Sequence, residues 1–285
     1  MIHYIENDFL KIGVKDFGCE LTSIVSKETG FEYLWQGDEA VWAGQSPILF
    51  PIIGRLIDDR YTLDGTEYEM PKHGFARKTQ WDFLFADETS MSFALKSNET
   101  TFKSYPYCFE LVVTFSLEGR TLTVNHLVKN KNEKVMLFSI GAHPAFNCAI
   151  GDILTFDENE TISTKKIDLQ KSLLLPEAFP LLKNEKDIVI TREIFKEDAL
   201  ILNGIKSKNI TLRSDSHNRT IKFNIGNAPW LGIWAKPGAP YVCIEPWFGV
   251  NDSQIKKDDL SQKEGINAIA PGCDFNFVWS AEFSE

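Results

Sequence analysis

Short apolar runs separated by turn residues are the feature that most restricts what this chain can fold into. In segments such as Phe9–Val14, Glu20–Val25 and Ser90–Leu95, apolar runs alternate with Gly- or Asp-containing turns at a spacing of roughly ten residues. Apolar residues at helical spacing are nowhere sustained over about twelve residues. The sequence therefore predicts an all-β fold. A large antiparallel β-sandwich is favoured over a propeller, because no motif recurs at a period of about 40–50 residues.

Two hairpins are predicted from their turns. Asp64-Gly65 separates Tyr61–Leu63 from Thr66–Tyr68, and Asp-Gly provides the positive φ angles of a type I′ turn. The strand-like runs 109–115 and 121–128 flank a second turn that contains glycine. Both pairs of runs are expected to form neighbouring antiparallel strands.

Other parts of the chain are less regular. Asp157–Glu185 is the most irregular segment and is interpreted as long loops. Thr191–Phe195 is the best candidate for a short helix, with Thr191 as its cap. No Gly/Ser- or Pro-rich linker divides the chain, so a single domain over residues 1–285 is expected.

Composition limits the partners and the compartment. The 285 residues carry a net charge of -10 without a basic run, so neither nucleic acid nor an anionic membrane is expected as a partner. Nothing approaches the ~20 apolar residues of a membrane span, and the N-terminus does not resemble a signal peptide. Five dispersed cysteines without a Cys-x-x-Cys pair argue against a disulfide framework and a zinc knuckle. We therefore expect a cytoplasmic protein.

Two titratable residues, far apart in the chain, are each followed by proline and flanked by aromatic residues. His143 precedes Pro144, and Glu245 precedes Pro246. Proline disfavours the helical conformation of the residue before it, so both side chains are expected on extended backbone. A general acid and a general base acting on a sugar ring need such fixed positions. The alternative, that both are ordinary strand-end residues, is equally compatible with the sequence.

The sequence neighbours of three other residues indicate whether each is a binding residue or a structural one. His73 lies in a predicted loop beside Gly74, with Arg77 four residues on, and it is interpreted as either a binding residue or a turn histidine. Arg55 has apolar neighbours and needs a ligand or an internal carboxylate, with the internal partner slightly favoured. His126 shares a strand face with apolar residues, so it is predicted to be buried in the core.

Asp198 precedes a predicted buried strand, where it is either a binding carboxylate or an ordinary turn aspartate. Trp230, Trp234 and Trp247 offer flat apolar surfaces of the kind that stack on sugars, although most tryptophans belong to the core.

Other kinds of site fit the sequence less well. His73, His143 and Glu245 could form a two-histidine, one-carboxylate metal site, but they are widely separated, so no metal is predicted. No glycine-rich nucleotide-binding loop and no serine-hydrolase elbow is present.

Together these motifs resemble the aldose 1-epimerase (galactose mutarotase) family over nearly the whole chain. The resemblance is nearest to the branch of hexose-6-phosphate mutarotases and of the mutarotase-like protein encoded with lactose genes. It rests on five motifs in the family order: Gly54-Arg55, 73–77, 143–147, Asp198 and 245–247.

The resemblance implies a galactose mutarotase-like supersandwich with a cleft on one sheet, and neither a cofactor nor a required metal. It implies that His143 is the general acid at the ring oxygen and Glu245 the base at the anomeric hydroxyl. An arginine pair is associated with phosphate in the sugar-phosphate branch. The residues expected to contact the substrate are Arg55, His73, Arg77, Asp198 and Trp247.

The expected function is therefore that of an aldose 1-epimerase, which interconverts the α and β anomers of a hexose or hexose phosphate. His143 must be protonated for this reaction, and a nearby carboxylate is expected to favour that. Ala145 and Cys148 stand where free-sugar enzymes carry tyrosine and leucine, which leaves the sugar open. The alternatives are a non-catalytic carbohydrate-binding protein and a glycosidase. The protein is expected to be a monomer or homodimer.

Overall fold

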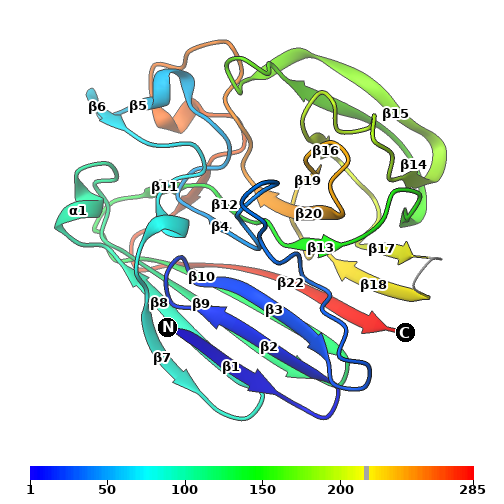
Figure 1. Cartoon of the computed structure of the whole chain (residues 1–285). Coiled ribbons are helices and arrows are strands. Elements are labelled where there is room, and N and C mark those ends of the chain that lie inside the picture. Colours follow the sequence, from blue (N-terminus) through cyan, green and yellow to red (C-terminus); the bar gives the residue numbers. More distant parts are fainter. Residues whose placement is uncertain (215–217) are drawn as a thin grey trace.

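One 15-stranded antiparallel sheet organises the computed structural model, which describes residues 1–214 and 218–285 (Figure 1). Its strands are hydrogen-bonded in the order β4-β12-β20-β19-β16-β14-β17-β18-β22-β10-β9-β8-β7, while β13 pairs with β20 and β15 with β14. Their bounds are β4 Ile48–Leu49, β7 Asp82–Ala86, β8 Ser90–Lys96, β9 Phe109–Glu118, β10 Thr121–Asn130, β12 Ile140–Ala142, β13 Ala145–Asn147, β14 Ile153–Ile167, β15 Leu174–Val189, β16 Leu200–Asn203, β17 Asn209–Ser214, β18 Arg219–Asn224, β19 Trp230–Trp234, β20 Tyr241–Phe248 and β22 Asp274–Ser284.

Smaller sheets and short helices complete the described part of the chain. The smaller sheets are β1 Ile2–Glu6, β2 Leu10–Lys15 and β3 Glu20–Ser26; β5 Arg60–Leu63 and β6 Thr66–Glu69; and β11 Met136–Phe138 and β21 Asn267–Ile269. The helices are α1 Glu99–Phe102 and the 3-10 turns η1 Ile57–Asp59, η2 Ala76–Lys78 and η3 Leu260–Gln262. The predicted all-β class with few short helices is confirmed.

The core lies where the three-stranded sheet β1–β3 covers one end of the large sheet, over β8, β9, β10 and β22 (Figure 1). Alternate residues of β9 and β10 are buried, as expected for strands with one face on a core. Their side chains belong to the same apolar cluster as Ile12, Val14 and Ile24 of the small sheet. Burial of one face of each sheet thus holds the two sheets together.

The predicted hairpins are confirmed. Asp64 and Gly65 have φ angles of 51° and 78°, as a type I′ turn requires, and they join β5 to β6. β9 and β10 pair along their whole length from Phe109–Asn130 to Glu118–Thr121.

Two predictions about irregular segments are wrong. Asp157–Glu185 does not form long loops, because most of it belongs to the paired strands β14 and β15. β15 lies at an edge and buries few side chains, so its sequence lacks the expected alternation, and an edge strand tolerates proline at 176 and 180. Thr191–Phe195 is not a helix; Thr191 accepts a hydrogen bond from Ile194 N (3.2 Å) in a turn.

The remaining sequence expectations concern single residues and membrane spans. His126 is 1% exposed and stacks on Phe277, which confirms its core position. The sequence around His217 is rich in the residues that favour turns, which predicts a turn, but His217 lies outside the described residues. No helix among the described residues has the length and apolar character needed to cross a membrane.

Burial of His126 makes a pH-dependent contribution to stability. Burial lowers the pKa of His126 to about 3 from an ordinary value of 6.5. The folded state therefore keeps this imidazole neutral while the unfolded chain binds a proton below pH ~6.5, so stability falls as the pH falls. Between pH 7 and pH 5, the wild type should lose about 2 kcal/mol of unfolding free energy relative to His126→Phe. Urea unfolding of both proteins tests this, and parallel losses would contradict it.

Candidate active site

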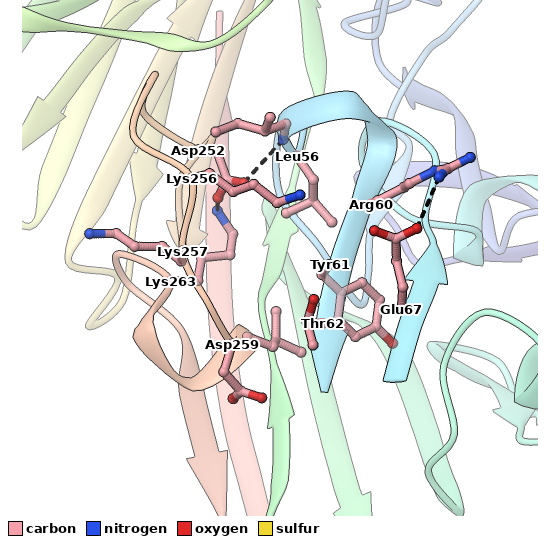
Figure 2. A pocket seen from close by; sticks show the side chains of 12 residues that line it. Leu56, Arg60, Tyr61, Thr62, Glu67, Asp252, Lys256, Lys257, Asp259 and Lys263 are labelled. Atoms are coloured by element: carbon pink, nitrogen blue, oxygen red, sulfur yellow. Dashed lines mark hydrogen bonds and ion pairs between the residues drawn. The ribbon is translucent and has the colours of Figure 1, made fainter. Parts of the chain in front are cut away.

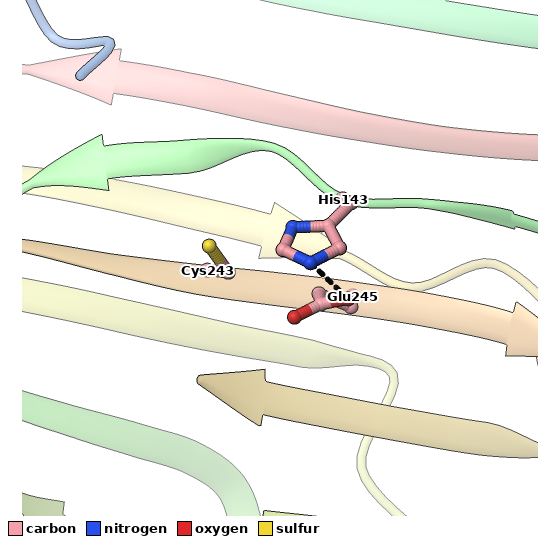
Figure 3. Close-up of side chains that lie close together, drawn as sticks. All are labelled: His143, Cys243 and Glu245. Atoms are coloured by element: carbon pink, nitrogen blue, oxygen red, sulfur yellow. Dashed lines mark ion pairs between the residues drawn. The ribbon is translucent and has the colours of Figure 1, made fainter. Parts of the chain in front are cut away.

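The register of β20 against a broken neighbouring strand brings His143 and Glu245 together. β12 pairs Gly141 with Trp247, and β13 pairs Ala145 with Cys243. Between β12 and β13, Pro144 O accepts a hydrogen bond from Ile244 N of β20 (3.2 Å), and by this register position 143 lies opposite 245. The imidazole Nε2 is 3.2 Å from Glu245 Oε2 (Figure 3). The interrupting proline thus leaves a histidine facing a carboxyl group across two strands.

The pair is buried, and burial controls its protons. The side chains of His143 and Glu245 are 11% and 1% exposed. Burial lowers the pKa of His143 to about 3 and raises the pKa of Glu245 well above its ordinary value, with Asp198 adding to the second effect. Both shifts favour uncharged forms, so the resting pair is a neutral imidazole beside a protonated carboxyl. The expectation that a nearby carboxylate favours a protonated His143 concerns the complex with substrate and stays a prediction.

The pair lies at the floor of a cleft of about 440 Å³. This volume falls within the range of small-molecule sites. Of the predicted substrate contacts, the cleft contains His73, Arg77, Asp198 and Trp247. The complete lining is Trp42, Lys72, His73, Arg77, His143, Ile167, Leu169, Phe195, Lys196, Asp198, Ala199, Trp234, Pro237, Glu245, Trp247 and Asn251.

His73 is held by paired backbone contacts that fix its tautomer. His73 N donates to Gly54 O (2.8 Å), and Gly54 N donates to His73 Nδ1 (3.1 Å). Because Nδ1 accepts a hydrogen bond, the neutral ring carries its proton on Nε2. Burial lowers the pKa of His73 well below its ordinary value, and Lys72 and Arg77 lower it further. His73 therefore presents an uncharged N–H donor, with its ring 6.2 Å from that of His143.

Cationic side chains line one part of the cleft. Arg77, on η2, donates to the backbone oxygen of Lys72 (2.9 Å), and its buried Nε has no hydrogen-bond partner. Neither Arg77 nor Lys72 forms an ion pair with a carboxylate among the described residues. Asp198 lies in the turn before β16 with a φ of 70°. The positively charged side chains of Lys72 and Arg77 and the hydrogen-bond acceptor Asp198 thus line the same cleft.

Arg55 does not reach this cleft. Its Nε and Nη2 donate to both carboxylate oxygens of Asp59 (2.8 and 2.6 Å), one turn further along the chain at η1. Arg55 lines a separate hollow together with Lys171 and Gln254. The internal-carboxylate alternative for Arg55 is therefore the one observed, and the predicted sugar contact is absent from this conformation.

A third hollow is lined by four cationic residues, of which Lys263 and Arg60 have partners within the protein (Figure 2). The buried Lys263 amine donates to Val250 O (2.6 Å) and to Asp252 (2.9 Å), while Asp252 also accepts from Ile57 N (3.1 Å). Arg60 forms ion pairs with Glu67 and Glu69. The Arg60 pairs join β5 to β6, while the contacts of Asp252 hold the segment after β20 against η1, at the end of the strand that carries Glu245.

Trp42 is a cleft residue that the sequence did not single out. Its ring stacks on His143 at 5.2 Å and 26°, and it meets Trp234 edge-on at 5.4 Å. Trp42 lies in a loop without a regular pattern, so no periodicity marked it. Of the three tryptophans proposed from the sequence, Trp234 and Trp247 line the cleft, while Trp230 packs in the apolar cluster beneath it.

The β-sandwich with this cleft is a galactose mutarotase-like fold, and comparisons with known proteins define the family. The family model described as aldose 1-epimerase matches residues 1–258. The chain belongs to the aldose 1-epimerase family.

Three similar proteins illustrate its place there. The plasmid-encoded protein LacX of Lactococcus lactis subsp. lactis is 34% identical over 282 residues, covering 94% of each chain. A galactose mutarotase related enzyme from Lactobacillus acidophilus has 32% identity and a TM-score of 0.93, covering 100% of this chain and 98% of that one. A galactose mutarotase-like protein from Lactobacillus casei has 28% identity and a TM-score of 0.92, with 100% of both chains covered.

The loop that carries His73 depends on Gly74. Gly74 has a φ of 71°, and a Cβ there would lie 2.2 Å from Phe50 O, whereas a Cβ on Gly65 (φ 78°) would meet nothing within 4 Å. Gly65→Ala should therefore cost only backbone strain, about 1–2 kcal/mol. Gly74→Ala should cost about 1–3 kcal/mol more, because the backbone must also move. Denaturant unfolding of both variants tests this, and equal losses would contradict it.

Proposed function

We propose that this protein is an aldose 1-epimerase that interconverts the α and β anomers of a hexose or hexose phosphate. The observation that carries the proposal is the buried pair of His143 and Glu245, 3.2 Å apart at the floor of a cleft. The ring oxygen and the anomeric hydroxyl of a sugar are bonded to the same carbon. Two groups this close can therefore exchange protons with both oxygens at once.

The reaction moves one proton in each direction. In the complex, His143 carries the proton of the pair and Glu245 is ionised. Glu245 takes the proton of the anomeric hydroxyl, His143 gives its proton to the ring oxygen, and the bond from C1 to that oxygen breaks. The aldehyde turns about C1–C2, and ring closure reverses both transfers. Each positioned acid or base contributes typically ~10²–10⁴-fold to the rate.

Neighbouring groups support this charge distribution. Lys72 lowers the pKa of Glu245 and so opposes the effect of burial. The stacked face of Trp42 favours an imidazolium at His143. After ring opening, the pair is a neutral imidazole and a protonated carboxyl, which is the form that burial favours. Burial therefore favours the step that opens the ring.

Lys72 and Arg77 make a sugar phosphate the favoured substrate class within this proposal. Both line the cleft, and an arginine can bind a phosphate through two parallel hydrogen bonds. Lys196 also lines the cleft but forms an ion pair with Glu193. Lys72 therefore takes the place of Arg55, which was expected to pair with Arg77 but forms an ion pair with Asp59.

A glycosidase is the alternative for which Asp198 and Glu245 would be the two carboxyl groups, one on either side of the bond that breaks. Both line the cleft, but the group that faces Glu245 at 3.2 Å is an imidazole, which favours the epimerase.

Removal of either member of the pair tests the reaction. Glu245→Gln and His143→Gln should each lower the enzyme-dependent rate of anomer interconversion by about 10²–10⁴-fold, because each loses one proton transfer. The rate is measured by polarimetry of freshly dissolved α-glucose and α-galactose and by NMR exchange of sugar phosphates. Circular dichroism controls for folding. A wild-type protein that binds sugars without accelerating exchange would identify a carbohydrate-binding protein instead.

The substrate class is tested by two arginine variants. Arg77→Ala should lower kcat/KM for a hexose phosphate by about 10- to 100-fold, the value of hydrogen bonds to a charged group, and should affect the free sugar less. Arg55→Ala is the matched control, because it removes the same charge outside the cleft. It should leave the ratio of kcat/KM for the hexose phosphate to kcat/KM for the free sugar unchanged. Equal losses on both substrates in Arg77→Ala would remove the argument for phosphate.

A further inference from the structure

A buried thiol lies next to the acid/base pair and has no part in sugar chemistry. Cys243 is two residues before Glu245 on β20, so both side chains point to the same face of the sheet. One ligand atom each from His143, Cys243 and Glu245 lies within 4.8 Å of the others (Figure 3). Cys243 is a free cysteine with no exposed surface.

The trio also contains a polar atom without a partner. Glu245 Oε2, the oxygen that faces His143 Nε2, is buried and has no hydrogen-bond partner among the described residues. Buried polar atoms in proteins are nearly always paired, so this oxygen indicates a place where a ligand completes the bonding.

Nitrogen, sulfur and oxygen donors together suit zinc. Zn²⁺ binds histidine nitrogen, cysteine sulfur and carboxylate oxygen, and sites open to solvent use three protein ligands. Two N or O ligands on a tetrahedral zinc ion lie about 3.3 Å apart, given bonds of about 2.0–2.1 Å. The separation of His143 Nε2 and Glu245 Oε2 is 3.2 Å. A sulfur ligand lies about 3.5 Å from the other two ligand atoms in such a site, so the Cys243 sulfur needs a shift of up to about 1.3 Å to complete the set.

We propose that His143, Cys243 and Glu245 form a Zn²⁺ site whose occupation switches the protein off. The ion replaces the protons of the thiol and the carboxyl group, which pass to solvent, and the two resulting negative charges neutralise the dication. Its fourth position faces the cleft. Inhibition rests on the proposed function, because the metal takes the lone pairs that would exchange protons with the sugar. Metal binding does not depend on that function.

Co²⁺ provides a direct probe, because a cobalt–thiolate bond gives a near-ultraviolet charge-transfer band. The full-length protein is titrated with Co²⁺ without oxygen, in a Cys273→Ser background that removes the exposed thiol. One equivalent should produce the thiolate band, and one equivalent of Zn²⁺ should abolish it. Absence of the band in this background would overturn the proposal.

Variants assign the ligands. Cys243→Ser should lose the band and weaken Zn²⁺ binding at least about tenfold, or 1.4 kcal/mol. Glu245→Gln should weaken binding similarly, which keeps the test available if Cys243→Ser does not fold. Cys148→Ser, which alters the other strongly buried thiol near Cys243, is the matched control and should keep the band. A band that persists in Cys243→Ser would overturn the assignment.

Inhibition is measured separately. For each protein, the rate of anomer exchange with stoichiometric Zn²⁺ is divided by the rate without Zn²⁺. The wild type should be inhibited and Cys243→Ser should resist. Zinc binding without inhibition would overturn the switch. A cobalt band in a protein with no exchange activity would leave the metal site intact and remove the proposed function.

Discussion

The site depends on the register that sets β12 and β13 against β20. Two short strands on either side of His143-Pro144 pair with one continuous strand, so the unpaired histidine is held opposite Glu245. Strand pairing alternates side chains between two faces, so a slip of one residue would turn Glu245 away from the cleft. Other elements hold β20 in this register. β19 pairs with the other edge of β20, and the core beneath β10 and β22 stabilises the large sheet.

Burial determines which protonation states of His143 and Glu245 are favoured. In water, an imidazole and a carboxylate 3.2 Å apart would form an ordinary ion pair. Here desolvation drives both groups toward their neutral forms, while Lys72, Asp198 and Trp42 act on the balance from the walls of the cleft. Ionisable groups with pKa values shifted by burial and by neighbouring charges are typical of catalytic sites.

Local sequence rules predicted much of the fold and part of the site. The Asp64-Gly65 turn, the β9–β10 hairpin and the burial of His126 follow from patterns within a few residues. The proline that follows His143 and Glu245 drew attention to both residues of the pair. Their contact depends on strand pairing between segments about a hundred residues apart in the sequence. The family resemblance predicted that contact, whereas the local sequence pattern could not.

The errors have physical causes as well. Arg55 has a carboxylate four residues away at Asp59, and the ion pair between them places Arg55 outside the lining of the cleft. β15 buries few of its side chains, so hydrophobic alternation could not reveal it. Trp42 comes from an irregular loop whose position is fixed by tertiary contacts, including Lys236 Nζ to Val41 O (3.0 Å).

Membership in the aldose 1-epimerase family and the buried pair lead to one claim: His143 and Glu245 act together with a single shared proton. The pH dependence of kcat/KM for anomer exchange by the wild type tests this most directly. The account predicts a bell-shaped profile. On the acid side, kcat/KM falls where the pair gains a second proton. On the alkaline side, above the usual carboxyl range, kcat/KM falls where the pair loses its single shared proton. A profile independent of pH, or exchange no faster than in buffer alone, would contradict it.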